Sequence, residues 1–253
     1  MERVDALRSR RAELERAVSS APSVPAFAPA LRGPTVRVIA EVKRRSPSRG
    51  AINVALDAAP QAAAYEDGGA AAVSVLTEPH HFGGSNSDLE MVRARIGIPL
   101  LKKDFHVDDS QLLEARVLGA SAALLIVRAL RPDRLAQLVK AADALGLESL
   151  VEVRTEEELR RALDGGARVV GVNCRNLETL EVDLGVAREL MPRIPADVVA
   201  VWESGIANAD DVARAAACGA DAVLVGSVVS ADSDPAAAVR RLGGVPRVEG
   251  ARG

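Results

Sequence analysis

Short apolar runs alternate along this chain with longer charged runs rich in Ala and Leu. Helical patterns such as 133–145, after Pro132, and 156–163, after the capping residue Thr155, separate the apolar runs. Strands separated by helices indicate parallel βαβ units. Eight runs have the length and composition of β-strands, at 36–43, 71–77, 100–104, 122–127, 149–153, 169–173, 198–204 and 222–226.

Eight such units in one chain fit a closed (β/α)₈ (TIM) barrel of the α/β class better than an open doubly wound sheet. No G-x-G-x-x-G follows the first strand, which argues against a Rossmann fold. Six glycines stand where helices would end before a strand, namely Gly69, Gly97, Gly119, Gly146, Gly166 and Gly219. We predict a single domain, with an N-terminal helix and connector over 1–35, the barrel over 36–243 and a flexible tail over 244–253.

The segment before the first strand has a different pattern. Residues 4–18 predict one amphipathic helix, with Val4, Leu7, Leu14 and Val18 along one stripe. Residues 19–34 are rich in Pro, Ala and Ser, and we expect an extended connector there.

Polar side chains fall at the carboxyl ends of five predicted strands, where (β/α)₈ barrels carry their chemistry. Side chains alternate between the two faces of a strand, so residues two apart point the same way. Any one of these groups alone is more commonly a solvated loop residue. Ionised groups are costly to bury unless they are paired or used, so the whole set predicts a functional cluster. Its charged members are Glu41, Lys43, Lys103, Glu152 and Glu203, with Asn173 and Arg175 beside them.

Three carboxylates and two ammonium groups suit proton transfer, because close opposite charges and burial shift each other's pKa values. The lysines would oppose Mg²⁺ at the same place. His80, His81 and His106 are expected in loops, and neither they nor the two cysteines have a metal-ligand spacing. We therefore expect no metal.

Gly and Ser follow the last two predicted strands, at Ser204-Gly205 and Gly226-Ser227. Barrels commonly bind phosphate at these two loops through backbone N–H groups, which glycine allows to approach closely. Ser46 in the first loop could add a hydroxyl donor. Two ordinary turns would give the same residues, so both interpretations stay open.

Composition excludes several classes of function. The 253 residues carry a formal net charge of -3 and only 2% aromatic residues, which leaves no footprint for nucleic acid or an acidic membrane surface. No apolar run is long enough to span a bilayer, and the N-terminus has no secretory pattern. We predict a soluble, cytoplasmic protein whose partner is a small molecule.

The segment IAEVKRRSPS at 39–48 closely resembles the signature of the indole-3-glycerol-phosphate synthase family of tryptophan biosynthesis. The resemblance continues, in the family's order, through 74–78, 82–85, 103–105, 150–153, 171–177, 203–206 and 225–227. It implies ring closure of 1-(2-carboxyphenylamino)-1-deoxyribulose 5-phosphate to indole-3-glycerol phosphate, with loss of CO₂ and water and without a cofactor.

The same resemblance implies roles for individual residues. Lys103 would be the general acid on the substrate carbonyl, and Lys43 would hold the carboxylate. Glu41 and Glu152 would be acid–base or electrostatic groups that Asn173 orients. The predicted catalytic set is Glu41, Lys43, Lys103, Glu152, Asn173, Glu203 and Ser204. The predicted substrate-binding set is Ser46, Gly205, Gly226 and Ser227 for phosphate, Phe82 and Phe105 for the anthranilate ring, and Arg175.

Other functions stay open at this point. Another phosphate-binding barrel, such as a sugar-phosphate isomerase, would share the last two loops but not Glu41 and Lys43 together with Lys103. A catalytically silent scaffold would have lost inward charges, and none is missing. Any weak association with other tryptophan-pathway enzymes would be non-covalent. The chain departs from the family in a shorter N-terminal region and in Trp202, which by parity we expect to face the helix layer.

Overall fold

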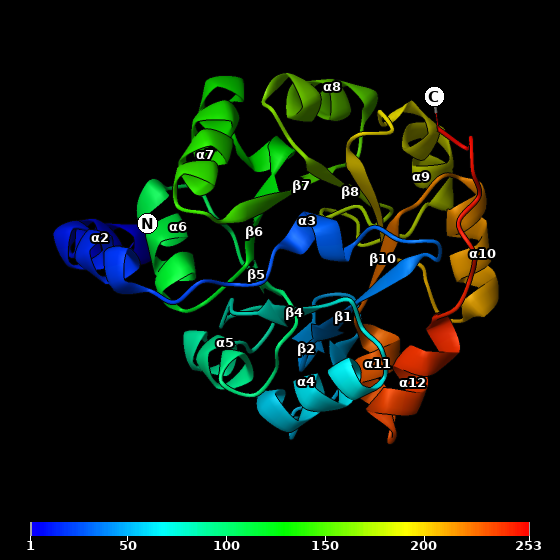
Figure 1. The fold of residues 1–253 in the computed structure, drawn as a ribbon, viewed down its shortest axis with the longest axis horizontal. Helices are drawn as coiled ribbons and strands as arrows, with labels where there is room; N and C mark the ends of the chain where they lie inside the picture. The colour runs from blue at the N-terminus through cyan, green and yellow to red at the C-terminus, as the bar shows by residue number, and fades with distance from the viewer. Residues whose placement is uncertain (1, 253) are drawn as a thin grey trace.

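The computed structural model describes residues 2–252, and its eight longer strands form a closed parallel barrel. Around the barrel the strand order is β1-β10-β9-β8-β7-β6-β5-β4, with β4 pairing back onto β1 (Figure 1). Every strand end lies within one residue of its prediction, so the (β/α)₈ fold class is confirmed. The strands are β1 (Arg37–Val42), β4 (Ala72–Leu76), β5 (Leu100–Lys103), β6 (Ala122–Ile126), β7 (Glu148–Val153), β8 (Val169–Asn173), β9 (Val199–Glu203) and β10 (Ala222–Val225).

Helices follow every barrel strand and form its outer layer (Figure 1). They are α4 (Ala58–Asp67), α5 (Asn86–Arg93), α6 (Asp109–Val117), α7 (Pro132–Ala144), α8 (Glu156–Asp164), α9 (Leu184–Leu190), α10 (Ala209–Ala217), α11 (Ser227–Ala231) and α12 (Pro235–Leu242). Short elements add β2 (Arg45–Ser46), β3 (Gly50–Ala51), η1 (Val127–Ala129) and η2 (Met191–Arg193).

The predicted local signals for two helices are confirmed. Pro132 is the first residue of α7, and the Thr155 hydroxyl accepts a hydrogen bond from the Glu158 N–H at the start of α8. Of the six glycines before strands, all except Gly97 have a positive φ, as expected where a helix ends in the left-handed conformation.

Apolar side chains form two layers, one on each side of the barrel wall. The interior layer includes Ile39, Leu101 and Leu150, and the outer layer lies between strands and helices. Trp202 packs in the outer layer, which confirms the parity prediction, and its Nε1–H donates to the Ser204 carbonyl at 3.0 Å. Because alternate strand residues face opposite layers, the polar groups at the strand ends all point into the barrel mouth.

The prediction of one N-terminal helix over 4–18 is wrong. The chain forms two helices, α1 (Glu2–Ser9) and α2 (Arg11–Ser20), which are separated by a turn at Arg10. In this turn the Arg10 N–H donates to the Leu7 carbonyl. Tertiary contacts explain the break. The turn lets α1 reach the barrel rim, where Arg3 pairs with Asp104 at 2.8 Å, while α2 packs along α6.

The extended connector over 19–34 was also incomplete as a prediction, because it contains the short helix α3 (Phe27–Ala30). Phe27 and Leu31 are fully buried against the interior layer, and α3 lies across the end of the barrel opposite the strand carboxyl ends (Figure 1). Glu148, the first residue of β7, accepts the Phe27 N–H at 2.5 Å and the Ala28 N–H at 3.1 Å.

The C-terminal segment differs from the flexible tail predicted over 244–253. Within its described part, the Val245 carbonyl accepts the Val36 N–H at 2.8 Å. The Arg252 side chain is 4% exposed and pairs with the fully buried Asp221 at 2.6 Å. These contacts fasten the segment beside the starts of the barrel strands, so it is part of the folded body.

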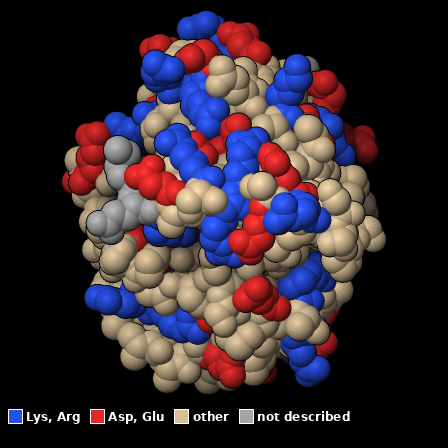
Figure 2. Space-filling model, turned by 90° about the vertical axis from the view of Figure 1, so that its left-hand side faces the viewer, with Lys and Arg blue, Asp and Glu red and all other residues tan. Residues whose placement is uncertain are grey.

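The face that carries α1, α2 and α6 shows acidic and basic side chains interspersed (Figure 2). Within α2, Arg11 pairs with Glu15 one turn further on, which is typical of a solvated helix face. Among residues 2–252, no helix has both the length and the apolar character needed to cross a membrane.

Candidate active site

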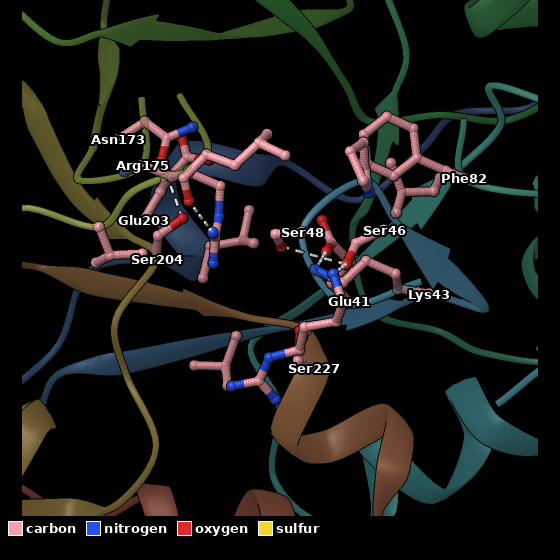
Figure 3. Close-up of a pocket in the computed structure, with 18 of the residues that line it drawn as sticks. Glu41, Lys43, Ser46, Ser48, Phe82, Asn173, Arg175, Glu203, Ser204 and Ser227 are labelled. Carbon is pink, nitrogen blue, oxygen red and sulfur yellow. Dashed lines mark hydrogen bonds and ion pairs between the residues drawn. The ribbon is translucent and has the colours of Figure 1, made fainter. Parts of the chain in front are cut away.

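A cavity of about 760 Å³ opens at the carboxyl ends of the barrel strands. Thirteen of the fourteen predicted site residues line it, and the exception, Glu152, lies behind Lys103. Asn173, Arg175, Glu203 and Ser204 lie on one side of the cavity, and Lys43, Ser46 and Phe82 lie on the other (Figure 3). The structure therefore brings both predicted sets together around one space.

The floor of the cavity holds the predicted charge cluster. The Lys103 ammonium at the end of β5 lies 3.5 Å from a carboxylate oxygen of Glu152 and 3.5 Å from one of Glu203. Directly after β1, the Lys43 ammonium lies 2.7 Å from a carboxylate oxygen of Glu41 on that strand. All five side chains are largely buried, so their charges interact more strongly than at a protein surface.

Burial and mutual charge set the protonation of this cluster. Burial disfavours the charge on Lys103, but the surrounding carboxylates, Glu203 first among them, outweigh burial and raise the pKa of Lys103. Burial alone would raise the pKa of Glu41, yet the ammonium groups of Lys43 and Lys103 lower it. Burial raises the pKa of Glu203 to about 8, with the Lys103 ammonium opposing the shift and Glu152 adding to it.

Glu203 is therefore mainly protonated at neutral pH. One carboxyl oxygen of Glu203, Oε1, is buried and has no hydrogen-bond partner among the described residues. The arrangement thus offers a charged acid, a neutral acid and two carboxylates within one small volume, which suits stepwise proton transfer.

Glycines on neighbouring strands make room for these carboxylates. A methyl group at Gly171 on β8 would overlap Oε1 of Glu203. A methyl group at Gly226 would overlap the Glu41 carboxylate and would lie 2.6 Å from Nζ of Lys43. Gly226, which we predicted only as a phosphate-binding residue, therefore also makes room for the Glu41–Lys43 pair.

Asn173 connects the ends of β8 and β9. Its Oδ1 accepts the Ser204 hydroxyl and the Arg175 N–H, both at 2.9 Å. Ser204 has φ 71°, a left-handed conformation that is uncommon outside glycine and that recurs at functional sites. Together with Gly205 it turns the chain sharply and faces its hydroxyl toward Asn173.

The walls of the cavity combine cations with apolar side chains. The Arg175 guanidinium donates to the Leu180 carbonyl at 2.6 Å. Burial, together with the nearby charge of Arg49, lowers the pKa of Arg175. Phe105 is 45% exposed at the rim, where it faces the opening together with Phe82. Cations near an apolar wall suit a ligand with an aromatic ring and anionic groups.

Sequence reasoning missed several members of this site. Gly171 was quoted in a motif but given no role, although it stands two residues before Asn173 on the same face. Arg49 lies within the loop after the first predicted strand, and its place beside Ser, Pro and Gly was the signal that could have identified it. Other wall residues that were not predicted include Ser48, His81, Leu177, Leu180 and Val182.

The predicted histidines lie in loops, as expected, but in different environments. His80 and His81 are exposed, whereas His106 is fully buried next to the rim and its Nδ1 lies 2.9 Å from the Leu124 carbonyl. Burial, and then the charge of Lys102, lowers the pKa of His106 to about 4, so it is neutral at physiological pH. Within residues 2–252, no group of three or more His, Cys, Asp or Glu is placed to hold a metal ion.

Comparisons with known proteins identify relatives over nearly the whole chain. A family model described as indole-3-glycerol phosphate synthase matches residues 1–242. Indole-3-glycerol phosphate synthase 1 of Streptomyces coelicolor is 52% identical over 228 residues, which cover 90% of this chain and 84% of the relative. The Rhodococcus jostii protein of the same name is 48% identical over 231 residues, covering 91% and 86% respectively.

Solved structures resemble the fold at much lower sequence identity. Thiamine phosphate pyrophosphorylase from Pyrococcus furiosus superposes with a TM-score of 0.61 at 18% identity, covering 84% of this chain and 95% of that one. At this identity the likeness concerns the barrel alone.

Proposed function

Because the chain belongs to the indole-3-glycerol phosphate synthase family, we propose that it closes the indole ring of 1-(2-carboxyphenylamino)-1-deoxyribulose 5-phosphate. The products are indole-3-glycerol phosphate, CO₂ and water. The observation that carries the proposal is the Lys103 ammonium, held between two carboxyl groups at the centre of the barrel mouth. A phosphorylated, carboxylated aromatic substrate also matches the cations and phenylalanines of the walls.

Lys103 is the general acid of ring closure. Its raised pKa keeps it protonated at neutral pH, so an ammonium is present when the substrate binds. As the ring carbon that bears the carboxylate attacks the ketose carbonyl, the oxygen gains negative charge. A hydrogen bond from Lys103 stabilises this charge and delivers the proton, which leaves a hydroxyl group on the new ring.

Carboxylates assist the steps that follow. Ring closure leaves a positive charge that is delocalised between the ring and nitrogen, and the carboxylates of Glu41 and Glu152 stabilise it. Breaking the bond to the carboxyl group releases CO₂ and returns the electron pair to the ring. Loss of the hydroxyl as water then needs an acid at the oxygen and a base at the neighbouring carbon. Glu203 is mainly protonated at neutral pH and lies next to Lys103, so it can serve as that acid.

The remaining residues bind and orient the substrate. Arg175 and Lys43 face the substrate carboxylate until it leaves as CO₂, and Asn173 fixes the Arg175 backbone and the Ser204 hydroxyl. Phe82 and Phe105 contact the aromatic ring. The phosphate, at the other end of the substrate, binds to Ser46, Gly205, Gly226 and Ser227. These four residues line the same cavity.

The decisive test is product formation by the purified protein in the presence of EDTA, followed through indole fluorescence. Replacing Lys103 with Ala should lower kcat by about 10³-fold or more while substrate still binds, which calorimetry measures. Lys140→Ala, on the exposed side of α7, is the matched control and should leave kcat unchanged. Substrate binding without turnover by the unaltered protein would instead favour another phosphate-binding barrel.

A further inference from the structure

The segment between β4 and α5 is organised around one buried carboxylate. Glu78 is only 5% exposed, and its carboxylate accepts three consecutive backbone N–H groups. Oε1 accepts from His80 at 2.9 Å, whereas Oε2 accepts from His81 at 2.7 Å and from Phe82 at 3.3 Å. Two of these three residues, His81 and Phe82, line the cavity.

The same segment is closed at its far end by Gly84. The Gly84 N–H donates to the backbone carbonyl of Glu78 at 3.0 Å. A side chain at Gly84 would overlap the Leu76 carbonyl, so the chain returns directly onto the end of β4. The loop 78–84 is therefore compact, and the Glu78 carboxylate occupies its interior.

Glu78 has no lysine or arginine within salt-bridge distance among residues 2–252, and the charge of Arg3 acts on it only from farther away. A buried carboxylate without a cation is costly unless hydrogen bonds replace its hydration. Here three backbone N–H groups replace the hydration of the Glu78 carboxylate. The carboxylate in turn fixes the direction of these three successive peptide groups. Such an arrangement specifies one loop conformation, and that conformation presents Phe82 to the cavity.

We propose that Glu78 is a positioning residue for substrate binding, which acts by holding Phe82 in place before the substrate arrives. This inference rests on the proposed function, because it assigns Phe82 to the aromatic ring of the substrate. Without the carboxylate, the loop samples several conformations, and only a fraction presents Phe82 correctly. The apparent affinity falls by that fraction, whereas the proton-transfer groups stand on other strands and keep their geometry.

The expected result is therefore a change in KM with little change in kcat. Glu78→Ala should raise KM about tenfold and leave kcat within about threefold of the parent. Phe82→Ala should raise KM by a similar factor through the lost ring contact. The double variant should bind no more weakly than the weaker single variant, because Glu78 acts through Phe82. If the KM increases of the two single variants instead multiplied in the double variant, the inference would be overturned.

Glu66→Ala is the matched control. Glu66 also accepts two loop N–H groups, from Gly97 at 2.9 Å and Ile98 at 3.1 Å, but at the opposite end of the barrel. This variant should keep the parental KM. Glu78→Gln tests the chemistry more gently if the Ala variant folds poorly. Its amide retains one acceptor oxygen but turns an NH₂ toward the remaining amides, so KM should rise partway.

Hydrogen exchange makes this inference testable apart from the reaction. The amides of 80–82 should exchange slowly in the parent protein and at least tenfold faster in Glu78→Ala, with the barrel strands unchanged. Unchanged exchange would refute the proposed role of Glu78 even in an active enzyme. Conversely, faster exchange together with an inactive parent protein would retain the loop organisation and overturn the proposed reaction and the Phe82 assignment.

Discussion

Gly171 offers the sharpest test of the charge cluster, because its replacement disturbs a catalytic side chain without removing it. In Gly171→Ala the new methyl group would overlap Oε1 of Glu203, since ordinary contacts of a Cβ exceed 3.0 Å. Oε1 of Glu203 must therefore retreat by about 1 Å, and this movement shifts Oε2 of the same carboxyl group, which lies 3.5 Å from the Lys103 ammonium. Misplacing a catalytic group by about this distance can lower turnover by about 10²-fold.

We therefore expect kcat to fall about 100-fold, with KM changed less than about threefold, because the phosphate and aromatic contacts lie elsewhere. The added methyl should also lower the free energy of unfolding by about 1–3 kcal/mol, as for other overfilled interiors. Steady-state kinetics by indole fluorescence and urea unfolding give the two quantities.

Two controls separate local displacement from general damage. A methyl group at Gly33 would lie 3.6 Å from Arg37 Cδ, an ordinary contact, so Gly33→Ala should match the parent in kcat. Shortening the acid in Gly171→Ala/Glu203→Asp should relieve the overlap and recover part of the lost kcat. A folded Gly171→Ala protein with parental kcat would refute the placement of Glu203 in the mechanism.

Further predictions concern acidity, glycine geometry and the C-terminal contact. The raised pKa of Glu203 stabilises the fold below its unfolded value near 4.5, and this stabilisation is lost as pH rises through about 8. The unfolding free energy should therefore fall between pH 6.5 and 8, and Glu203→Gln should remove most of that slope in urea titrations. Gly226→Ala should lower kcat as well as substrate affinity, because the methyl displaces Lys43; a pure affinity change in steady-state kinetics would contradict this. Asp221→Asn should cost about 3 kcal/mol in urea unfolding by leaving Arg252 buried without its partner, with kcat unchanged.

The strands and the inward charges were predictable because both follow from short-range periodicity. A period of two places Glu41 and Lys43 on one face wherever the strand lies, and the barrel end is then fixed by topology. This is why Lys103 and Glu203 could be assigned to one cluster from positions 100 residues apart. The family motifs then added roles that periodicity cannot supply.

Features set by contacts between distant residues were not predictable in this way. The role of Gly171 depends on where the Glu203 side chain of the next strand lies, and glycine alone in a strand gives no such signal. The turn at Arg10 follows from ion pairs between α1 and the barrel rim. The fastened C-terminal segment depends on Asp221 and Arg252, a pair with no periodic pattern around it.

The two ends of the chain are fastened at opposite ends of the barrel, and this has a practical consequence for anyone who handles the protein. Arg3 in α1 is bound to Asp104, directly after Lys103, so a tag or fused domain on the N-terminal side would stand beside the entrance. Arg252 is bound near the starts of β9 and β10, away from the entrance. Immobilisation through the C-terminal side should therefore leave substrate access open.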